Sequence, residues 1–120
     1  MNTEIGDYGA PLDLKVRQGA DFRFTATIDV DLTGSVLRAQ MRKRGLDATL
    51  VLTFTIVVTD AVNGAFEVTL TKAQTAALTC GETPDETASR YVWDLELEDA
   101  LGRDTPLAYG VVRVLREVTR

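Results

Sequence analysis

The chain has 120 residues, 45% of them apolar, which fits one domain of ordinary size rather than two. It contains no histidine and a single cysteine, Cys80, so a Ser-His-Asp triad, a Cys-His nucleophile, a Cys/His zinc site and a disulfide within the chain are all excluded. Thirteen basic and eighteen acidic residues give a net charge of −5, which argues against nucleic acid as the main partner because phosphate binding needs a basic face.

Apolar and polar residues alternate along most of the chain with the period of two that is typical of half-buried strands. After an N-terminal tail over residues 1–10, we expect seven strands, near residues 12–16, 22–28, 36–42, 49–58, 66–71, 91–98 and 107–118. Glycine-containing turns separate several of them, with Gly34 ending one turn and Asn63-Gly64 forming a typical hairpin dipeptide.

Residues 72–78 interrupt this pattern because they are rich in helix-forming residues. Thr71 can cap the N-terminus, and Gln74 three residues later completes a capping box. We expect about two helical turns, with Ala73, Ala77 and Leu78 toward the core.

These elements predict an all-β fold: a seven-stranded antiparallel immunoglobulin-like β-sandwich, with a short helix between the fifth and sixth strands. The sandwich domain is expected to span residues 11–120, with an exposed loop over residues 81–89.

Four basic residues lie on or just after the expected third strand: Arg38, Arg42, Lys43 and Arg44. Three acidic residues occupy the polar face of the expected sixth strand: Asp94, Glu96 and Glu98. In an immunoglobulin-like order these strands are antiparallel neighbours, so Arg38 and Arg42 would pair with the carboxylates across one sheet. The alternative, an anion or nucleic-acid patch, is less favoured.

The acidic residues Asp29, Asp31, Glu98 and Asp99 could suggest a catalytic or calcium site. However, the regular D-x-[DN]-x-[DN]-G calcium loop is absent, and acidic residues beside turns commonly accept hydrogen bonds from the backbone. We therefore expect no catalytic residue, no metal site and no cofactor.

Three further residues are expected to be structural. Cys80 has no histidine to activate it, which favours a bystander thiol. Tyr91 and Trp93 lie on the apolar phase of the sixth strand, which favours a place in the core over a role in stacking on a ligand.

The expected strand over residues 49–58 carries no charge on either face. Its second face is formed by Val51, Thr53, Thr55 and Val57. An uncharged strand is an aggregation hazard at a sheet edge, so this face is either covered or contacts another subunit. We place a candidate interface on these four residues and on Tyr8 of the expected tail.

Several short motifs follow one another along residues 12–120. They are LKVRQGADF at 14–22, DLTG at 31–34, RAQMR at 38–42, GAF at 64–66, QTAAL at 74–78, YVWDLE at 91–96, Gly110, and EVTR at 117–120. As a set they resemble small structural proteins encoded by tailed bacteriophages and prophages. More distantly, they resemble the immunoglobulin-like N-terminal domain of phage baseplate upper proteins.

The resemblance implies a virion component without enzymatic activity, cofactor or catalytic residues. We expect a structural subunit that is made in the host bacterial cytoplasm and docks in several copies, or as a homo-oligomer, onto other virion proteins. A tail, baseplate or fibre-attachment adaptor is favoured, because the chain lacks the long receptor-organising regions of baseplate upper proteins. No nucleic-acid or membrane partner is expected.

Two alternatives remain open. One is a capsid decoration (cement) protein, which belongs to the same structural class. The other is a carbohydrate-binding module, although the loops near Asp99 and over residues 81–89 carry almost no aromatic residues to stack on a sugar.

Overall fold

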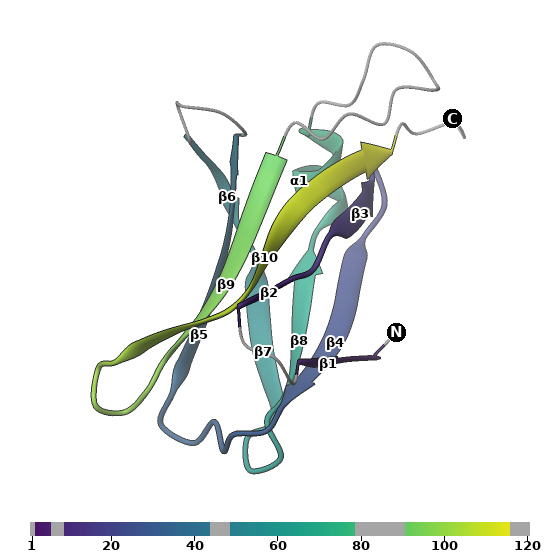
Figure 1. Cartoon of the computed structure of the whole chain (residues 1–120). Helices are drawn as coiled ribbons and strands as arrows, with labels where there is room; N and C mark the ends of the chain where they lie inside the picture. Colours follow the sequence, from purple (N-terminus) through teal and green to yellow (C-terminus); the bar gives the residue numbers. More distant parts are fainter. Residues whose placement is uncertain (1, 6–8, 44–48, 79–90, 116–120) are drawn as a thin grey trace.

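The computed structural model describes residues 2–5, 9–43, 49–78 and 91–115, which form two β-sheets packed face to face as a sandwich (Figure 1). Sheet A has the order β1 (Asn2–Ile5), β4 (Phe22–Ile28), β8 (Ala65–Leu70), β7 (Thr55–Asp60). Sheet B has the order β2 (Ala10–Pro11), β10 (Asp104–Leu115), β9 (Tyr91–Glu98), β5 (Val36–Lys43), β6 (Leu50–Thr53). A further strand, β3 (Leu14–Arg17), also pairs with β10.

Alternating burial along the strands creates one core between the sheets. In β9, for example, Tyr91, Trp93, Leu95 and Leu97 are buried, while the residues between them face outward. The Trp93 ring makes edge-on contacts with Phe24 and Phe54, at ring-centroid distances of 6.1 and 5.8 Å. Its indole N–H donates a 2.7 Å hydrogen bond to the carbonyl of Leu12, so the buried polar atom has a partner.

The all-β sandwich and the core positions of Tyr91 and Trp93 are confirmed, but the described residues form ten strands rather than seven. The expected strand over residues 49–58 is two strands, because the chain leaves sheet B and enters sheet A at Phe54. The Phe54 ring is buried, and the backbone N–H of Phe54 donates to the carbonyl of Ala39 on β5. Apolar alternation continues through this crossing because both strands face the same core.

The N-terminal residues also differ from expectation. Asn2–Ile5 of the expected tail forms β1, which pairs in parallel with β4 in sheet A. The chain then contributes β2 and β3 to sheet B, where both pair in parallel with β10. All other pairs are antiparallel, as predicted.

The helix α1 (Lys72–Ala76) begins where its capping residues predict. The Gln74 N–H donates to the Thr71 hydroxyl at 3.1 Å, and the Thr71 N–H donates to the Gln74 side-chain carbonyl at 2.9 Å. These two bonds are the predicted capping box, which satisfies two N–H groups at the start of the helix.

The orientation of α1 was predicted only in part. Leu78 is buried as expected, but Ala73 and Ala77 are exposed. The buried helical side chain is Thr75, whose hydroxyl donates to the carbonyl of Ala20 at 2.8 Å. A polar side chain with an internal partner therefore sets the buried face, which a hydrophobic pattern does not predict.

Gly64, in the β7–β8 turn, lies against the backbone that follows β4. Its φ is +72°, and a Cβ atom at this position would overlap the carbonyl oxygen of Ile28 and lie 2.7 Å from that of Val30. We expect Gly64→Ala to lower the free energy of unfolding by about 3 kcal/mol or more, from backbone strain plus overpacking. Urea denaturation measures this loss.

The matched control is Gly102→Ala, because Gly102 has a similar φ of +82° but no heavy atom within 4 Å of the added Cβ position. We expect Gly102→Ala to lower the free energy of unfolding by only about 1–2 kcal/mol, because the left-handed backbone is strained for a residue with a Cβ atom. Equal losses in the two variants would contradict the close packing at Gly64.

Candidate docking surface

Three loops lie together at the end of the sandwich opposite α1 (Figure 1). They connect β4 to β5 (residues 29–35), β7 to β8 (residues 61–64) and β9 to β10 (residues 99–103). We call this surface the loop end.

Contacts between the loops make the loop end one unit. The Leu32 N–H donates to the carbonyl of Ala61 at 2.7 Å, which joins the first loop to the second. The first loop also lies close to the third, because a Cβ atom added at Gly34 would lie 3.5 Å from the Cβ of Ala100. Leu32 itself is buried, so the first loop is fixed to the core beneath it.

Aspartates hold the first two loops in shape. Asp31 accepts hydrogen bonds from the Thr33 N–H at 2.9 Å and the Thr33 hydroxyl at 2.6 Å. These bonds lower the pKa of Asp31, the hydroxyl contributing most. Asp60 accepts from the Asn63 side-chain amide at 2.7 Å.

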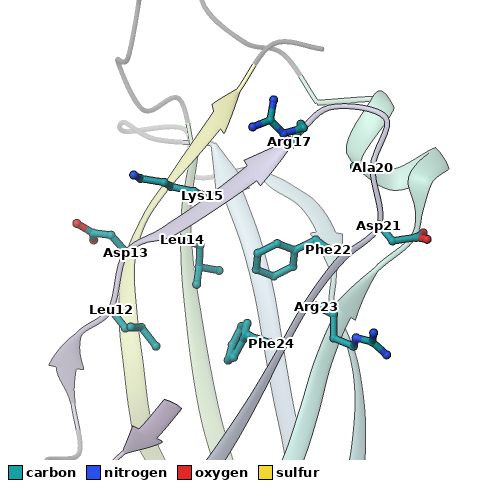
Figure 2. Close-up of a pocket in the computed structure, with 10 residues that line it drawn as sticks. All are labelled: Leu12, Asp13, Leu14, Lys15, Arg17, Ala20, Asp21, Phe22, Arg23 and Phe24. Atoms are coloured by element: carbon teal, nitrogen blue, oxygen red, sulfur yellow. The ribbon is translucent and has the colours of Figure 1, made fainter. Parts of the chain in front are cut away.

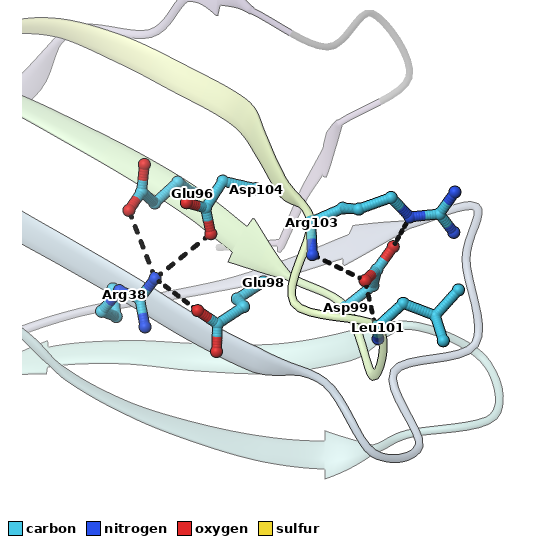
Figure 3. A network of polar contacts seen from close by, with 7 residues as sticks. All are labelled: Arg38, Glu96, Glu98, Asp99, Leu101, Arg103 and Asp104. Atoms are coloured by element: carbon cyan, nitrogen blue, oxygen red, sulfur yellow. Dashed lines mark hydrogen bonds and ion pairs between the residues drawn. The ribbon is translucent and has the colours of Figure 1, made fainter.

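Asp99 does the same for the third loop. Its carboxylate accepts from the Leu101 N–H at 2.9 Å, the Arg103 N–H at 3.0 Å and the Arg103 Nε at 2.9 Å (Figure 3). The backbone N–H of Arg103 is the main cause of a lowered pKa for Asp99, while desolvation acts in the opposite direction. The predicted backbone-capping role of Asp31 and Asp99 is thus confirmed.

Each loop presents one aliphatic side chain to solvent. Val62 is 69% exposed and Leu101 is 77% exposed, and Val30 is exposed as well. The three loops and the adjoining end of β7 also carry four aspartates and one basic residue: Asp29, Asp31, Asp60, Asp99 and Arg103. Exposed apolar side chains beside charged ones on an ordered backbone are compatible with a protein-binding surface.

A charged network on the outer face of sheet B adjoins the loop end (Figure 3). The Arg38 guanidinium lies 3.5 Å from a carboxylate oxygen of Glu96, and 3.4 Å from one of Glu98 and one of Asp104. The hydrogen bond to Glu98 is the largest cause of a raised pKa for Arg38. One cation faces three carboxylates here, so the network adds negative charge beside the loops.

This network confirms part of the predicted pairing. Arg38 contacts Glu96 and Glu98 as expected, whereas Asp94 lies opposite Gln40 in the register. The Arg42 guanidinium donates to the side-chain carbonyl of Gln40 at 3.0 Å. The contribution of Asp104 was not predicted, because the last strand begins three residues earlier than expected.

The four predicted interface residues on residues 49–58 do not share one face. Val51 is half-buried on β6 and packs against the core, and Thr53 is exposed on the same strand in sheet B. Thr55 and Val57 are exposed on β7 in sheet A. The expectation of a single face is therefore wrong, because the chain changes sheets at Phe54.

Several residues named in the sequence analysis lie outside the described residues: Tyr8, Arg44, Cys80 and the loop over residues 81–89. Among the described residues, no group of three or more cysteine or carboxylate side chains could hold a metal ion. The one helix in that part of the chain is too short to cross a membrane.

The apolar loop tips were missed by the sequence analysis. The sequence nevertheless contains a cue for these tips. Val62 precedes the Asn63-Gly64 turn, Leu101 precedes Gly102, and an apolar residue at a turn is normally exposed.

No protein-family model matches the chain, and no curated protein sequence matches it either.

Replacing Asp99 tests whether its carboxylate orders the third loop. Since the pKa of Asp99 is below its ordinary value of 3.8, the carboxylate stabilises the folded chain above pH 3.8, and this stabilisation is lost as the pH falls through the lowered pKa. We expect Asp99→Ala to unfold at lower urea than wild type at neutral pH, with the difference closing below pH 3.8. The control is Asp29→Ala on the neighbouring loop, and a difference that does not vary with pH would contradict a role for the ionised carboxylate.

Lysine substitutions test the division of residues 49–58 between two sheets. Val57, which is 53% exposed opposite Glu67, is expected to accept lysine with a change of about 0.5 kcal/mol or less in the free energy of unfolding. Val51→Lys removes a half-buried side chain that packs against the core, and we expect it to lower the free energy of unfolding by about 1–3 kcal/mol. Similar losses in the two variants would contradict the assignment, and sedimentation velocity shows whether Val57→Lys also reduces self-association.

Proposed function

We propose that the chain is a non-enzymatic structural subunit of a bacteriophage virion that docks through its loop end onto a larger virion protein. The observation that carries the docking role is the set of three neighbouring loops at one end of the sandwich, each with an exposed aliphatic side chain. The virion assignment rests on the resemblance of the sequence motifs to small phage structural proteins. A tail, baseplate or fibre-attachment adaptor is the role that we favour.

We further propose that the sandwich is of the immunoglobulin type. In that type, strands A, B, E and D form one sheet and strands C, F and G belong to the other. The antiparallel order β4-β8-β7 fits strands B, E and D of the first sheet, and the neighbours β10, β9 and β5 fit strands G, F and C of the second. The strand β1 lies in the place of strand A but pairs in parallel with β4, which departs from that type. The loop end then contains the B–C and F–G loops, which serve recognition in immunoglobulin variable domains.

The loop end favours a protein partner with a basic surface. Burial of Val62 and Leu101 would supply hydrophobic free energy, at roughly 25 cal/mol for each Å² of apolar surface removed from water. The contacts among the loops reduce the conformational entropy lost on binding. The aspartates of the same loops would meet Lys or Arg side chains of the partner, which would fix the orientation of the complex.

A carbohydrate-binding module is less favoured on the same evidence. The segments 29–35, 61–64 and 99–103 present aliphatic tips and contain no aromatic residue on which a sugar ring could stack. Capsid decoration requires the same kind of docking, so location in the particle separates it from a tail role.

Aspartate substitutions at the loop tips test docking in purified phage particles. We expect the double variant Val62→Asp/Leu101→Asp to fold normally, because both side chains are exposed, and to be incorporated at least about tenfold less than wild type. Quantitative immunoblotting of particles produced with each variant measures incorporation. The matched control, Leu50→Asp, replaces an exposed leucine on β6, opposite Arg42 near the end of β5 that is far from the loop end, and is expected to be incorporated normally.

Electron microscopy of particles that carry a labelled wild-type chain gives its position. Label on the tail or baseplate supports the favoured role, whereas label over the shell would replace it with capsid decoration. Absence of the chain from particles would overturn the virion proposal, and normal incorporation of the double variant would overturn docking through the loop end.

A further inference from the structure

One side of the sandwich is open between β3 of sheet B and β4 of sheet A (Figure 2). The groove there has a volume of about 550 Å³, within the usual range of ligand pockets. Apolar side chains from the two sides point into it: Leu12, Leu14, Phe22 and Phe24 (Figure 2). The groove lies away from the loop end, at the half of β4 nearer to α1 (Figures 1 and 2).

The groove is open because β1 covers only part of β4. The register pairs Asn2 with Thr25 and ends with Ile5 opposite Ile28, so within the described residues β1 does not reach residues 22–24. On their other side, residues 22–24 pair with β8. This stretch of β4 is therefore a strand edge beside an apolar cavity, within the part of the chain that the structure describes.

Backbone groups on both sides of the groove are positioned to pair with an added strand. The Ile28 N–H bonds toward the β8 side, to the carbonyl of Gly64. Because backbone N–H and C=O groups point to alternate sides along a strand, those of Arg23 point to the open side. By the same alternation, the Leu12 N–H bonds to β10, and the backbone groups of Lys15 point away from β10.

The charges at the rim favour an acidic occupant. Asp13 accepts a hydrogen bond from the Val111 N–H at 3.1 Å, and Asp21 accepts one from the Lys72 N–H at 3.2 Å. Both aspartates are exposed, as are the three basic residues that line the groove, so the lining carries one positive charge in excess: Lys15, Arg17 and Arg23 against Asp13 and Asp21. The Arg23 side chain is 68% exposed and lies 3.9 Å from Glu67, a weak surface ion pair.

From these observations we propose that the groove accepts a short extended segment of a neighbouring virion protein, which adds as a strand to the edge of β4 in line with β1. Alternate side chains of a strand point to opposite faces, so apolar residues of the segment would enter the groove over Phe22 and Leu14. The residues between them would lie on the outer face of sheet A beside Arg23, where acidic side chains are favoured. The segment therefore alternates apolar and acidic residues.

This inference names a second docking surface and rests on the proposed structural role. Residues 22–24 span roughly 10 Å at 3.3 Å per residue, so the paired segment is only a few residues long. A contact of this size is weak alone, but it gains strength when several copies or a second contact hold the partners together.

Defined peptides test the groove directly. The probe is a dye-labelled peptide of sequence GVEVEVG, and its binding is measured by fluorescence anisotropy. We expect saturable binding that weakens at least about tenfold for GVKVKVG, because the charge is reversed. A similar loss is expected when the backbone nitrogens of the two glutamates are methylated, because methylation removes the N–H donors of one edge of the peptide.

Variants of the protein complete the test. Arg23→Glu and Lys15→Glu change exposed rim residues and are expected to weaken GVEVEVG binding severalfold, whereas Lys43→Glu, at the end of β5, is the matched control and leaves it unchanged. The proposal is overturned by any of three results: no saturable binding, equal binding of the two peptides, or an equal effect of the three variants. It is also overturned if sedimentation velocity shows that copies of this chain associate through the groove and that Arg23→Glu abolishes the association, because the occupant would then be a second copy.

The proposals for the loop end and for the groove can be overturned independently of each other. The Val62→Asp/Leu101→Asp variant is expected to bind GVEVEVG like wild type, because its substitutions lie at the loop end. Loss of incorporation in that variant together with absent peptide binding would leave the proposed function standing and overturn only the groove.

Discussion

The structure depends on one constraint: a single chain must close both sides of a sandwich whose two sheets share one core. On one side the chain passes from β6 to β7 at Phe54, and the buried ring closes that side. On the other side β1 and β3 belong to different sheets and lie at different heights along the sandwich (Figure 1). The offset between β1 and β3 leaves the groove beside Phe22 and Leu14.

The same framework separates two surfaces that differ in their balance of charge. The loop end carries aspartates and the exposed side chains of Val30, Val62 and Leu101. The groove is lined by three basic residues, Lys15, Arg17 and Arg23, and by two aspartates. Surfaces that differ in this way select different partners, since like charges placed together oppose association. A small subunit with two such surfaces fits the adaptor role that we propose better than a role with one repeated contact.

Local rules predicted much of the fold from the sequence. The alternation in β9, the capping box of Thr71 and Gln74, and the pairing of Arg38 with Glu96 depend on neighbouring residues or on adjacent strands. The crossing at Phe54 was not predictable from alternation, because the pattern records which face is buried and not which sheet the strand joins. The sharing of β1, β2 and β3 between the sheets, and hence the groove, depends on contacts between distant segments.

The irregular pairing of the other edge strands indicates why the groove is the better place for strand addition. The β7–β8 pairing shifts register between Val58 and Asp60, and the β5–β6 pairing shifts between Met41 and Arg42. Such irregularities disrupt the edge and oppose unplanned pairing with other chains. The pairing of β4 with β8 is regular from Phe22 to Thr27, and that of β3 with β10 is regular as well. The regular edges flank the apolar groove and the irregular ones lie on the opposite side, so an added strand is favoured where it also buries apolar side chains.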